Sequence, residues 1–285
     1  MSTQINTAFV QQFSSNVTML SQQMGSLLRG SVDSETIVGE KAFFDQVGKA
    51  AAVARTTRHG DTPLMETPHS RRMVSLSDYE WADLIDSADK VRMLSDPTSN
   101  YAKAAAAAMG RSMDDVIIAA LNGTAQTGKA GTTGTVLPAA SKIAHGSGGL
   151  TKAKLISAKK KLDENSIDPS IPRYIAVSPE QIEDLLNITE VTSSDFATVK
   201  ALVQGDIDTF CGFKFITSNR LTDDGTSRLC LAWAEDGLKL GVGKDVTAQI
   251  TERADKSYST QVYYCMSIGA TRMEEEKVVQ IACNE

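Results

Sequence analysis

Residues 101–123 read YAKAAAAAMGRSMDDVIIAALNG, and this stretch constrains the fold more than any other part of the chain. Alanine has the highest helix propensity, and five consecutive alanines at 104–108 leave a helix with almost no side chain to bury. Asp96 can cap such a helix and Gly123 can end it. We therefore predict a helix over 97–122 whose first half is thin. Its second half has a conventional buried face, formed by Met113, Val116, Ile117, Ala120 and Leu121.

The first 28 residues contain no charged side chain. Apolar residues, among them Phe9 and Phe13, recur at spacings of three and four between Gln, Ser, Asn and Thr. This spacing predicts an amphipathic helix or arm with a neutral polar face. The segment lacks the basic start and the compact apolar core of a signal peptide. We expect it to pack either on a neighbouring subunit or back on its own domain.

Residues 36–76 are predicted to be extended and to form a hairpin, because aromatic and β-branched residues dominate the start of the segment and turn residues its middle. Between Lys49 and Arg72 the chain has five Lys or Arg residues against Asp61 and Glu66. A basic, two-stranded projection is the simplest interpretation.

Residues 77–94 read SDYEWADLIDSADKVRML, which we interpret as an acidic helix. Trp81, Leu84, Ile85, Ala88 and Val91 form its apolar stripe in this interpretation. Carboxylates occupy the rest of its surface and include Asp78, Glu80, Asp83 and Asp86. The chain thus places a basic projection directly before an acidic element, so the two could pair within one subunit or between neighbours.

The second half of the chain predicts an α/β unit followed by strands. Helices are expected at 150–164 and 179–187, with a strand at 173–177 between them; Ser178 and Gln181 form a capping box for the second helix. Residues 124–149 are expected to be a Gly- and Thr-rich loop with one short strand. Later strands are expected at FKFIT, LCLAWA, VTAQI, TQVYYCMSI and KVVQIAC. No run approaches the roughly 18 apolar residues of a membrane-spanning helix.

Composition excludes several functional classes. The net charge of −6 argues against a strongly basic nucleic-acid surface. Four cysteines and three histidines lie scattered without zinc-ligand spacing, and isolated thiols are typical of a reducing compartment. We expect neither a metal nor a cofactor.

No stretch makes a convincing active site. Residues 123–130 match a phosphate-binding loop up to its last position, where Ala130 replaces the required Ser or Thr, and the expected preceding strand and following helix are missing. Ser157 and Lys160 match SxxK but lie among exposed lysines. His59 and Asp61 have no nucleophile beside them. These absences favour a structural or interaction protein.

The order of elements resembles the major capsid proteins of tailed bacteriophages with the Hong Kong 97-type fold. The local text is similar to one branch of that family at GEKAFFDQVG (39–48), RHGDTP (58–63), YEWADLIDSADKVRMLSDPTSNY (79–101) and MGRSMDDVIIAALNGTAQTG (109–128). These stretches cover most of residues 36–128. Beyond them the resemblance is one of length and element order.

The resemblance implies an α+β fold with an N-terminal arm, an extended hairpin called the E-loop, a long spine helix, an antiparallel peripheral sheet and a central axial domain. The implied ranges are 1–35 for the arm, 36–76 for the E-loop, 77–139 for a peripheral domain with the spine helix, 140–241 for the axial domain and 242–285 for peripheral strands.

The resemblance also implies a function. The chain would self-assemble into hexamers and pentamers of an icosahedral shell around double-stranded DNA. Portal protein and cement or decoration proteins would be its partners, its contacts with the packaged DNA would be weak and non-specific, and it would need no membrane. It would be assembled in the host cytoplasm and found in the virion. Two alternatives are the shell of an encapsulin-like compartment and, in another class, a small-ligand or nucleotide enzyme on the α/β unit.

A shell subunit needs many modest contacts, which polar arms and oppositely charged loops provide. We expect the E-loop arginines to meet carboxylates of a neighbouring subunit, and the arm to pack on it through its aromatic residues. The expected contact residues are Arg55, Arg58, Asp61, Arg71, Arg72, Asp78, Glu80, Asp83, Asp86, Phe9 and Phe13.

Overall fold

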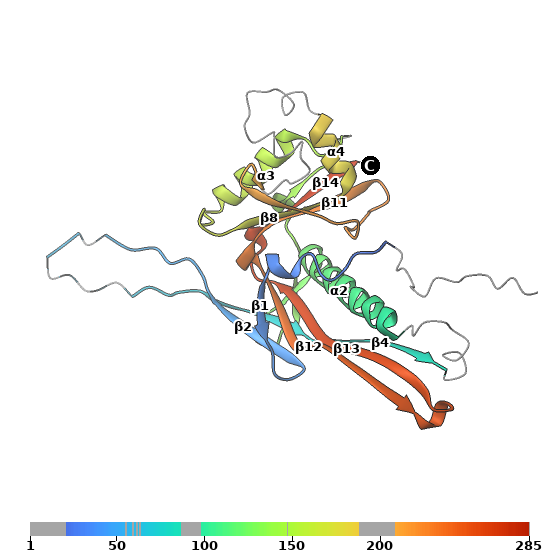
Figure 1. Ribbon diagram of the computed structural model, residues 1–285. Helices are drawn as coiled ribbons and strands as arrows, with labels where there is room; N and C mark the ends of the chain where they lie inside the picture. Colours follow the sequence, from blue (N-terminus) through green and yellow to red (C-terminus); the bar gives the residue numbers. More distant parts are fainter. Residues whose placement is uncertain are drawn as a thin grey trace, which may run out of the picture. The chain divides into compact units, whose positions relative to one another are not determined.

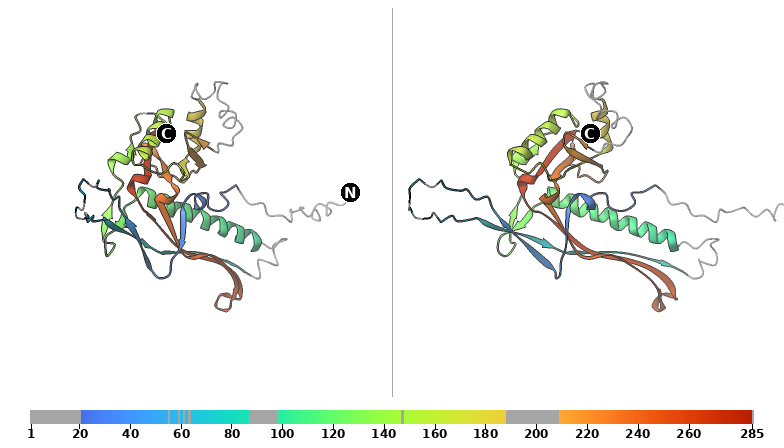
Figure 2. Two further views of the ribbon diagram at one scale, coloured as in Figure 1. Left: turned by 90° about the vertical axis from the view of Figure 1, so that its left-hand side faces the viewer. Right: turned by 60° about the vertical axis from the view of Figure 1, so that its left-hand side comes forward.

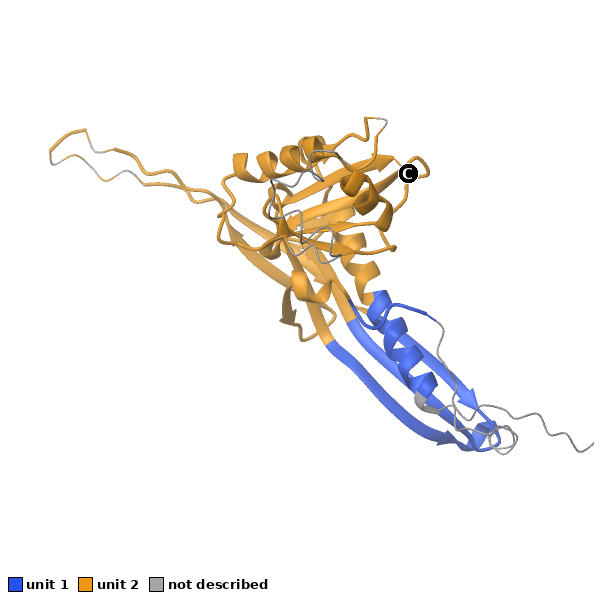
Figure 3. Ribbon diagram, turned by 45° about the horizontal axis from the view of Figure 1, so that its top comes forward, with its two compact units in different colours: residues 1–26, 78–112, 244–267 blue, residues 27–77, 113–243, 268–285 orange. Residues whose placement is uncertain are grey.

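The computed structural model of the protein describes residues 21–54, 56–58, 60, 62, 64–86, 98–146, 148–187 and 209–284. The chain forms two compact units (Figure 3). The first unit comprises residues 1–26, 78–112 and 244–267, and the second comprises residues 27–77, 113–243 and 268–285. One long helix and two long strands contribute residues to both.

A six-stranded mixed sheet is the core of the second unit. Its strands, in spatial order, are β7 (Lys142–Ile143), β14 (Val278–Asn284), β11 (Ser227–Ala234), β8 (Arg173–Val177), β10 (Phe213–Thr217) and β9 (Thr209–Phe210). Two helices, α3 (Lys152–Glu164) and α4 (Pro179–Asn187), lie beside this sheet in the second unit. Trp233 and Phe213 are fully buried in this sheet. The expected helices and strands of the α/β unit are confirmed.

Local side-chain bonds explain why both helices start where they do. The Thr151 hydroxyl accepts a hydrogen bond from the Lys154 amide at 3.3 Å. In α4, the side chain of Gln181 accepts from the Ser178 amide at 2.9 Å, which is one half of the predicted capping box. Asp184 of α4 then accepts from the Leu150 amide and so connects α4 to the start of α3.

A four-stranded sheet also lies in the second unit, in the order β2 (Lys41–Val47), β3 (His69–Ser75), β5 (Ala125–Thr127) and β6 (Thr133–Thr135). The antiparallel pair β2–β3 confirms the predicted hairpin. The loop expected over 124–149 with one short strand contains three, because β5 and β6 form a hairpin and β7 follows them. Gly128 and Gly131 have φ values of 91° and 65°, and this left-handed backbone makes the turn possible.

The third sheet has the order β1 (Asp33–Thr36), β12 (Leu238–Arg253), β13 (Ser259–Arg272) and β4 (Ser77–Ile85). The helix predicted for residues 77–94 is therefore wrong over 77–85, and most of its remainder lies outside the described residues. In β4, the more buried side chains alternate, at Tyr79, Trp81, Asp83 and Ile85, and Glu80 is exposed. The spacing of four between Trp81 and Ile85 fits both periods, and strand pairing with β13 decides between them.

Helix α2 (Thr98–Asn122) confirms the predicted spine helix. In both views of Figure 2 its first half lies along the strands of the third sheet. Ala105 and Ala107 are buried, as are Met113, Ile117 and Leu121 in its second half. The Gly123 amide donates to the Ala119 carbonyl at 2.8 Å as the helix ends. Short 3₁₀ turns lie at Arg29–Ser31, Ala139–Ser141, Glu235–Gly237, Ala254–Lys256 and Glu275–Lys277.

None of the helices in the described ranges is long and apolar enough to cross a membrane.

Candidate assembly surfaces

The β2–β3 hairpin carries a long extension, residues 48–68, which we call the projecting loop (Figure 1). Its base is closed by a hydrogen bond of 2.7 Å from the Gly48 amide to the Pro68 carbonyl. Beyond the base, described residues of the loop expose apolar side chains, with Leu64 96% and Val53 58% exposed. Arg58 is exposed as well. The loop therefore presents both apolar and basic groups to solvent.

Arg71 and Asp45 face each other across the hairpin. Nε of Arg71 lies 2.5 Å from Oδ1 of Asp45, and Nη2 lies 3.2 Å from Oδ2. The guanidinium also lies 5.4 Å from the ring centre of Phe43. This bidentate hydrogen bond lowers the pKa of Asp45 and raises that of Arg71. Both partners are solvent-exposed, so the pair orders the hairpin more than it stabilises the chain.

The turn between β13 and β14, residues 273–276, fastens the base of the hairpin, and we call it the clamp. Arg72 donates to the Met273 carbonyl at 2.8 Å and to Glu275 at 2.6 Å. The side chain of Gln46 donates to the same carbonyl at 2.9 Å. Lys49 and Glu276 form an exposed ion pair at 2.9 Å. Strands β2 and β3 thus contact the clamp separately, and these contacts fix the point at which the projecting loop begins.

Arg272 lies beside the clamp and is fully buried. Its guanidinium donates to the carbonyls of Leu121, Gly123 and Thr135 at 2.8–3.0 Å. Nε lies 3.7 Å from Glu275, which also pairs with Arg72. Burial lowers the pKa of Arg272, although the nearby Glu275 carboxylate opposes that shift. Arg272 thereby connects the C-terminal end of α2 to the clamp.

The carboxylates predicted on an acidic helix lie on or just after strand β4. Asp78, Glu80 and Asp86 are exposed, and Asp83 is half-buried. Glu80 accepts a hydrogen bond from the Tyr263 hydroxyl at 2.9 Å, and this bond, with burial second, raises the pKa of Tyr263 to about 12. The acidic surface is therefore one edge strand of a sheet.

Residues 23–28 lie in close contact with helix α2. Gly110 packs against Gly25 so tightly that a Cβ at position 110 would lie 2.3 Å from the Gly25 carbonyl carbon. In the same unit, Arg111 donates to the Gln23 carbonyl at 3.2 Å. In the second unit, the buried carboxylate of Asp114 accepts from the amides of residues 27 and 28, each at 3.1 Å. The small size of Gly110 on α2 thus allows the N-terminal segment, residues 23–28, to approach the helix closely.

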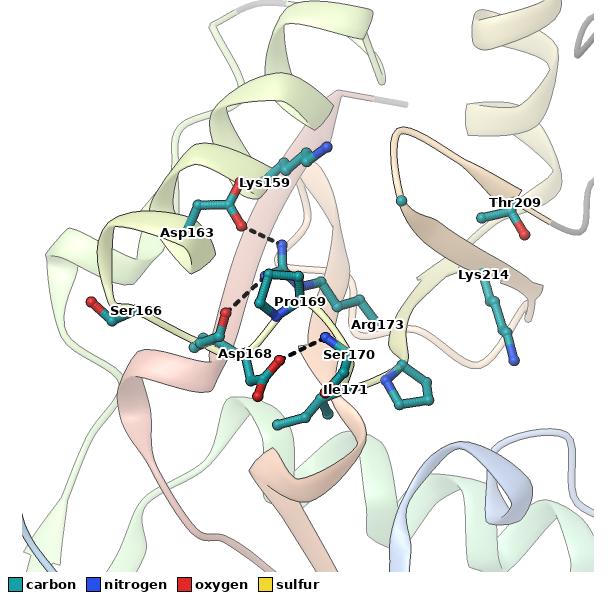
Figure 4. A pocket seen from close by; sticks show the side chains of 13 residues that line it. Lys159, Asp163, Ser166, Asp168, Pro169, Ser170, Ile171, Arg173, Thr209 and Lys214 are labelled. Atoms are coloured by element: carbon teal, nitrogen blue, oxygen red, sulfur yellow. Dashed lines mark hydrogen bonds and ion pairs between the residues drawn. The ribbon is translucent and has the colours of Figure 1, made fainter.

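A hollow of about 640 Å³ lies between α3 and β10 (Figure 4). Asp163 accepts from Arg173 at 2.7 Å, and Asp168 accepts from the Ser170 amide at 2.8 Å, which lowers the pKa of Asp168. These polar groups hold the loop that leads into β8. Across the described ranges no group of three or more His, Cys, Asp or Glu could hold a metal ion.

The structure places the predicted contact residues unevenly. Arg58, Arg71, Arg72 and the β4 carboxylates are described, whereas Arg55, Asp61, Phe9 and Phe13 lie outside the described residues. Arg71 and Arg72 have carboxylate partners within the chain, and whether they also contact a neighbouring subunit stays a prediction.

The role of Arg272 was not anticipated. Arg272 lies ten, six and four residues after the buried Val262, Met266 and Ile268, and these even spacings place it on the same face of β13. This even spacing is the sequence feature that could have predicted the burial of Arg272.

Comparison with known proteins identifies the family of this chain. Residues 5–285 match the family described as Phage capsid protein. No curated protein matches the chain in sequence.

Solved structures share the fold at low sequence identity. A capsid structure of the cyanophage P-SCSP1u has a TM-score of 0.78 and 17% identity, over 100% of this chain and 96% of that chain. The capsid of Ralstonia phage GP4 gives 0.74 and 12%, over 97% and 95%. A structure of Mycobacterium phage Che8 gives 0.70 and 18%, over 96% and 97%. The expected Hong Kong 97-type fold is confirmed.

Proposed function

The chain belongs to the phage capsid protein family, and we propose that it is the major capsid protein whose copies build the icosahedral head shell around the double-stranded DNA of a tailed phage. In this role it is a structural protein and carries out no catalysis. The chain would then have an N-terminal arm at 1–35, an E-loop at 36–76, peripheral segments at 77–139 and 242–285, and an axial domain at 140–241.

The single observation that carries this proposal beyond family membership is the projecting loop. An isolated globular subunit gains nothing from a long loop with Leu64 almost fully exposed and Val53 more than half exposed. The clamp nevertheless anchors the base of this loop through buried and exposed bonds on both strands. A loop with a fixed base and an uncovered apolar surface is suited to lie on another subunit.

We infer that the second surface of this contact is the acidic strand β4 of a neighbouring copy. Arg58, together with Arg55, would face Asp78, Glu80, Asp83 and Asp86 there, and Arg71 would lie at the margin. Each exposed pair would contribute at most about 1 kcal/mol, so the contact depends on repetition around a closed shell. The arm, through Phe9 and Phe13, would add apolar contact.

The remaining partners follow from the same role. Copies would group as hexamers and pentamers, meet a portal protein at one vertex, and accept cement or decoration proteins outside. Contact with packaged DNA would be weak and non-specific, because the chain has a net charge of −6. Assembly would take place in the host cytoplasm, and the final location would be the virion.

Size-exclusion chromatography followed by negative-stain microscopy tests the function. We expect the purified full chain to elute in part as a megadalton species that contains closed, uniform shells. A chain that remains a monomer or dimer over a range of salt and protein concentrations, and forms no particles, would contradict the proposal.

A further inference from the structure

Within the described residues, the outer edge of strand β12 has a partner strand over only a short part of its length. Strand β1 pairs with β12 only from Lys239 to Val242. Beyond Val242, no strand within the described ranges continues on this edge. Residues 243–252 are all exposed except Thr247, which is half-buried. Among the described residues, therefore, no strand covers the edge of this segment, and most of its side chains are exposed; we call it the open edge.

The backbone groups that point outward along the open edge can be identified. The Ile37 amide donates to the Val242 carbonyl at 3.0 Å, on the side of β12 where β1 lies. Backbone direction alternates along a strand, so even-numbered residues direct N–H and C=O outward. In agreement, the Val246 amide donates to the side chain of Asp245 at 2.8 Å instead of to a strand.

The sequence of the open edge is unusual for an unprotected strand. Residues 246–251 read VTAQIT, with β-branched side chains and no charge. Val246 is 37% exposed and Ile250 is 54% exposed. Natural proteins usually shorten, charge or cover such an edge, because it offers a template for pairing with another chain. Lys244 and Asp245 precede this uncharged stretch, and Glu252 follows it.

We propose that the open edge pairs with the open edge of a second copy of this chain, antiparallel and centred on Ala248. Antiparallel pairing at this centre places Lys244 opposite Glu252 and Val246 opposite Ile250, and a two-fold axis generates each pair twice. The outward-pointing amides and carbonyls of these residues would then bond to the second copy. Asp245, released from its own neighbour, would face the hydroxyl of Thr251.

The side chains favour the register centred on Ala248 over the registers centred on the adjacent residues. Centring the pair on Thr247 would place Lys244 opposite Ile250, and centring it on Gln249 would place Val246 opposite Glu252. Both leave a charge against an apolar side chain, whereas the register at Ala248 pairs opposite charges and apolar groups. The open edge is self-complementary only about Ala248.

The contact is small, because one short strand pair buries far less than a stable dimer interface. The second copy would therefore dock in the assembled shell, where other contacts hold it near, and the proposal rests on the proposed function in that respect. A free subunit would not dimerise through the open edge at micromolar concentration.

A charge exchange tests the register. Lys244→Glu and Glu252→Lys would each create two like-charge pairs per contact, and we expect each to lower particle yield roughly tenfold. The double variant restores opposite charges and should return the yield to that of the unmodified chain. Lys256→Glu, an exposed change beyond β12, serves as the control. Recovery in the double variant supports the proposal, and single variants without effect, or a double variant worse than both, would overturn it.

Cysteine substitution gives a direct readout in assembled particles. In the proposed register the two Ala248 Cα atoms lie about 5.5 Å apart, within disulfide range, so Ala248→Cys should give covalent dimers on a non-reducing gel. Lys256→Cys is the matched control, since this exposed residue lies beyond the proposed strand pair and far from its second copy.

The outcomes separate this contact from the capsid function. Particles of Ala248→Cys without dimers, or equal dimer yields from both variants, contradict the open-edge contact and leave the capsid function intact. Absence of particles from the unmodified chain contradicts the function instead. If Ala248→Cys alone fails to assemble, the charge variants decide.

Discussion

The buried charge of Arg272 lies where several secondary-structure elements meet. The last carbonyls of a helix have no partner within it, and in α2 the carbonyl of Leu121 and that of the following Gly123 are bonded by Arg272 from another element. The same guanidinium reaches the β6 carbonyl of Thr135. Removing one member of a buried charge cluster leaves the others without compensation, so such residues are sensitive to substitution.

We predict that Arg272→Met lowers the free energy of unfolding by about 3–5 kcal/mol, because it leaves buried carbonyls and part of the Glu275 carboxylate unpaired while keeping similar volume. Urea unfolding of the unassembled subunit measures this. Arg253→Met is the control: its pair with Asp255 is exposed, so we expect a much smaller change in the free energy of unfolding. Equal effects of the two substitutions would refute the role assigned to Arg272.

Among the elements, helix α2 depends on small side chains for its contact with the N-terminal segment. We predict that Gly110→Ala displaces residues 22–26, since the added Cβ would overlap the Gly25 backbone. Hydrogen exchange of these amides should speed up. Gly148→Ala is the matched control, because a Cβ there meets nothing within 4 Å. Unchanged exchange in Gly110→Ala would show that the segment does not pack on α2 as described.

The turn between β12 and β13 predicts a pH response. Arg253 donates to both carboxylate oxygens of Asp255, and this lowers the pKa of Asp255 from 3.8 to about 2. Because the pKa is depressed in the folded chain, the pair stabilises the turn above about pH 4 and is lost as pH falls through about 2. NMR titration of the carboxylate should show the low midpoint, and Arg253→Gln should return it toward 3.8. A midpoint near 3.8 in the unmodified chain would rule out this ion pair.

Across the whole molecule, charge on the projecting loop should decide assembly. Arg72 is unsuitable for this test because it is bonded inside the chain, whereas Arg58 is exposed. We predict that Arg58→Glu reduces particle yield without changing subunit stability, and that Asp78→Arg in the same chain partly restores it. Lys214→Glu, an exposed change on β10, controls for net charge. Particles formed as well by Arg58→Glu as by the unmodified chain would exclude the loop from the contact.

Local pattern predicted much of this fold. The spine helix, α3, α4, strand β8 and the hairpin are confirmed, together with one of the two hydrogen bonds of the α4 capping box, because propensity, capping residues and periodicity agree within each segment. The strand β4 was mistaken for a helix, since Trp81 and Ile85 are spaced by four, which suits both structures. The β5–β6 hairpin was missed because its strands are only three residues long.

By itself, the sequence determined the long thin helix, the extended basic hairpin, the uncharged N-terminal segment and the lack of any convincing active site. Only the tertiary structure decided that Arg72 and Arg272 are internal, that β4 is an edge strand, and that β12 ends in an open edge. The physical reason is that propensity and capping act between near neighbours, whereas burial of a charge and pairing of a strand depend on elements distant in the chain. The contacts proposed to build the shell also depend on elements that are distant in the chain.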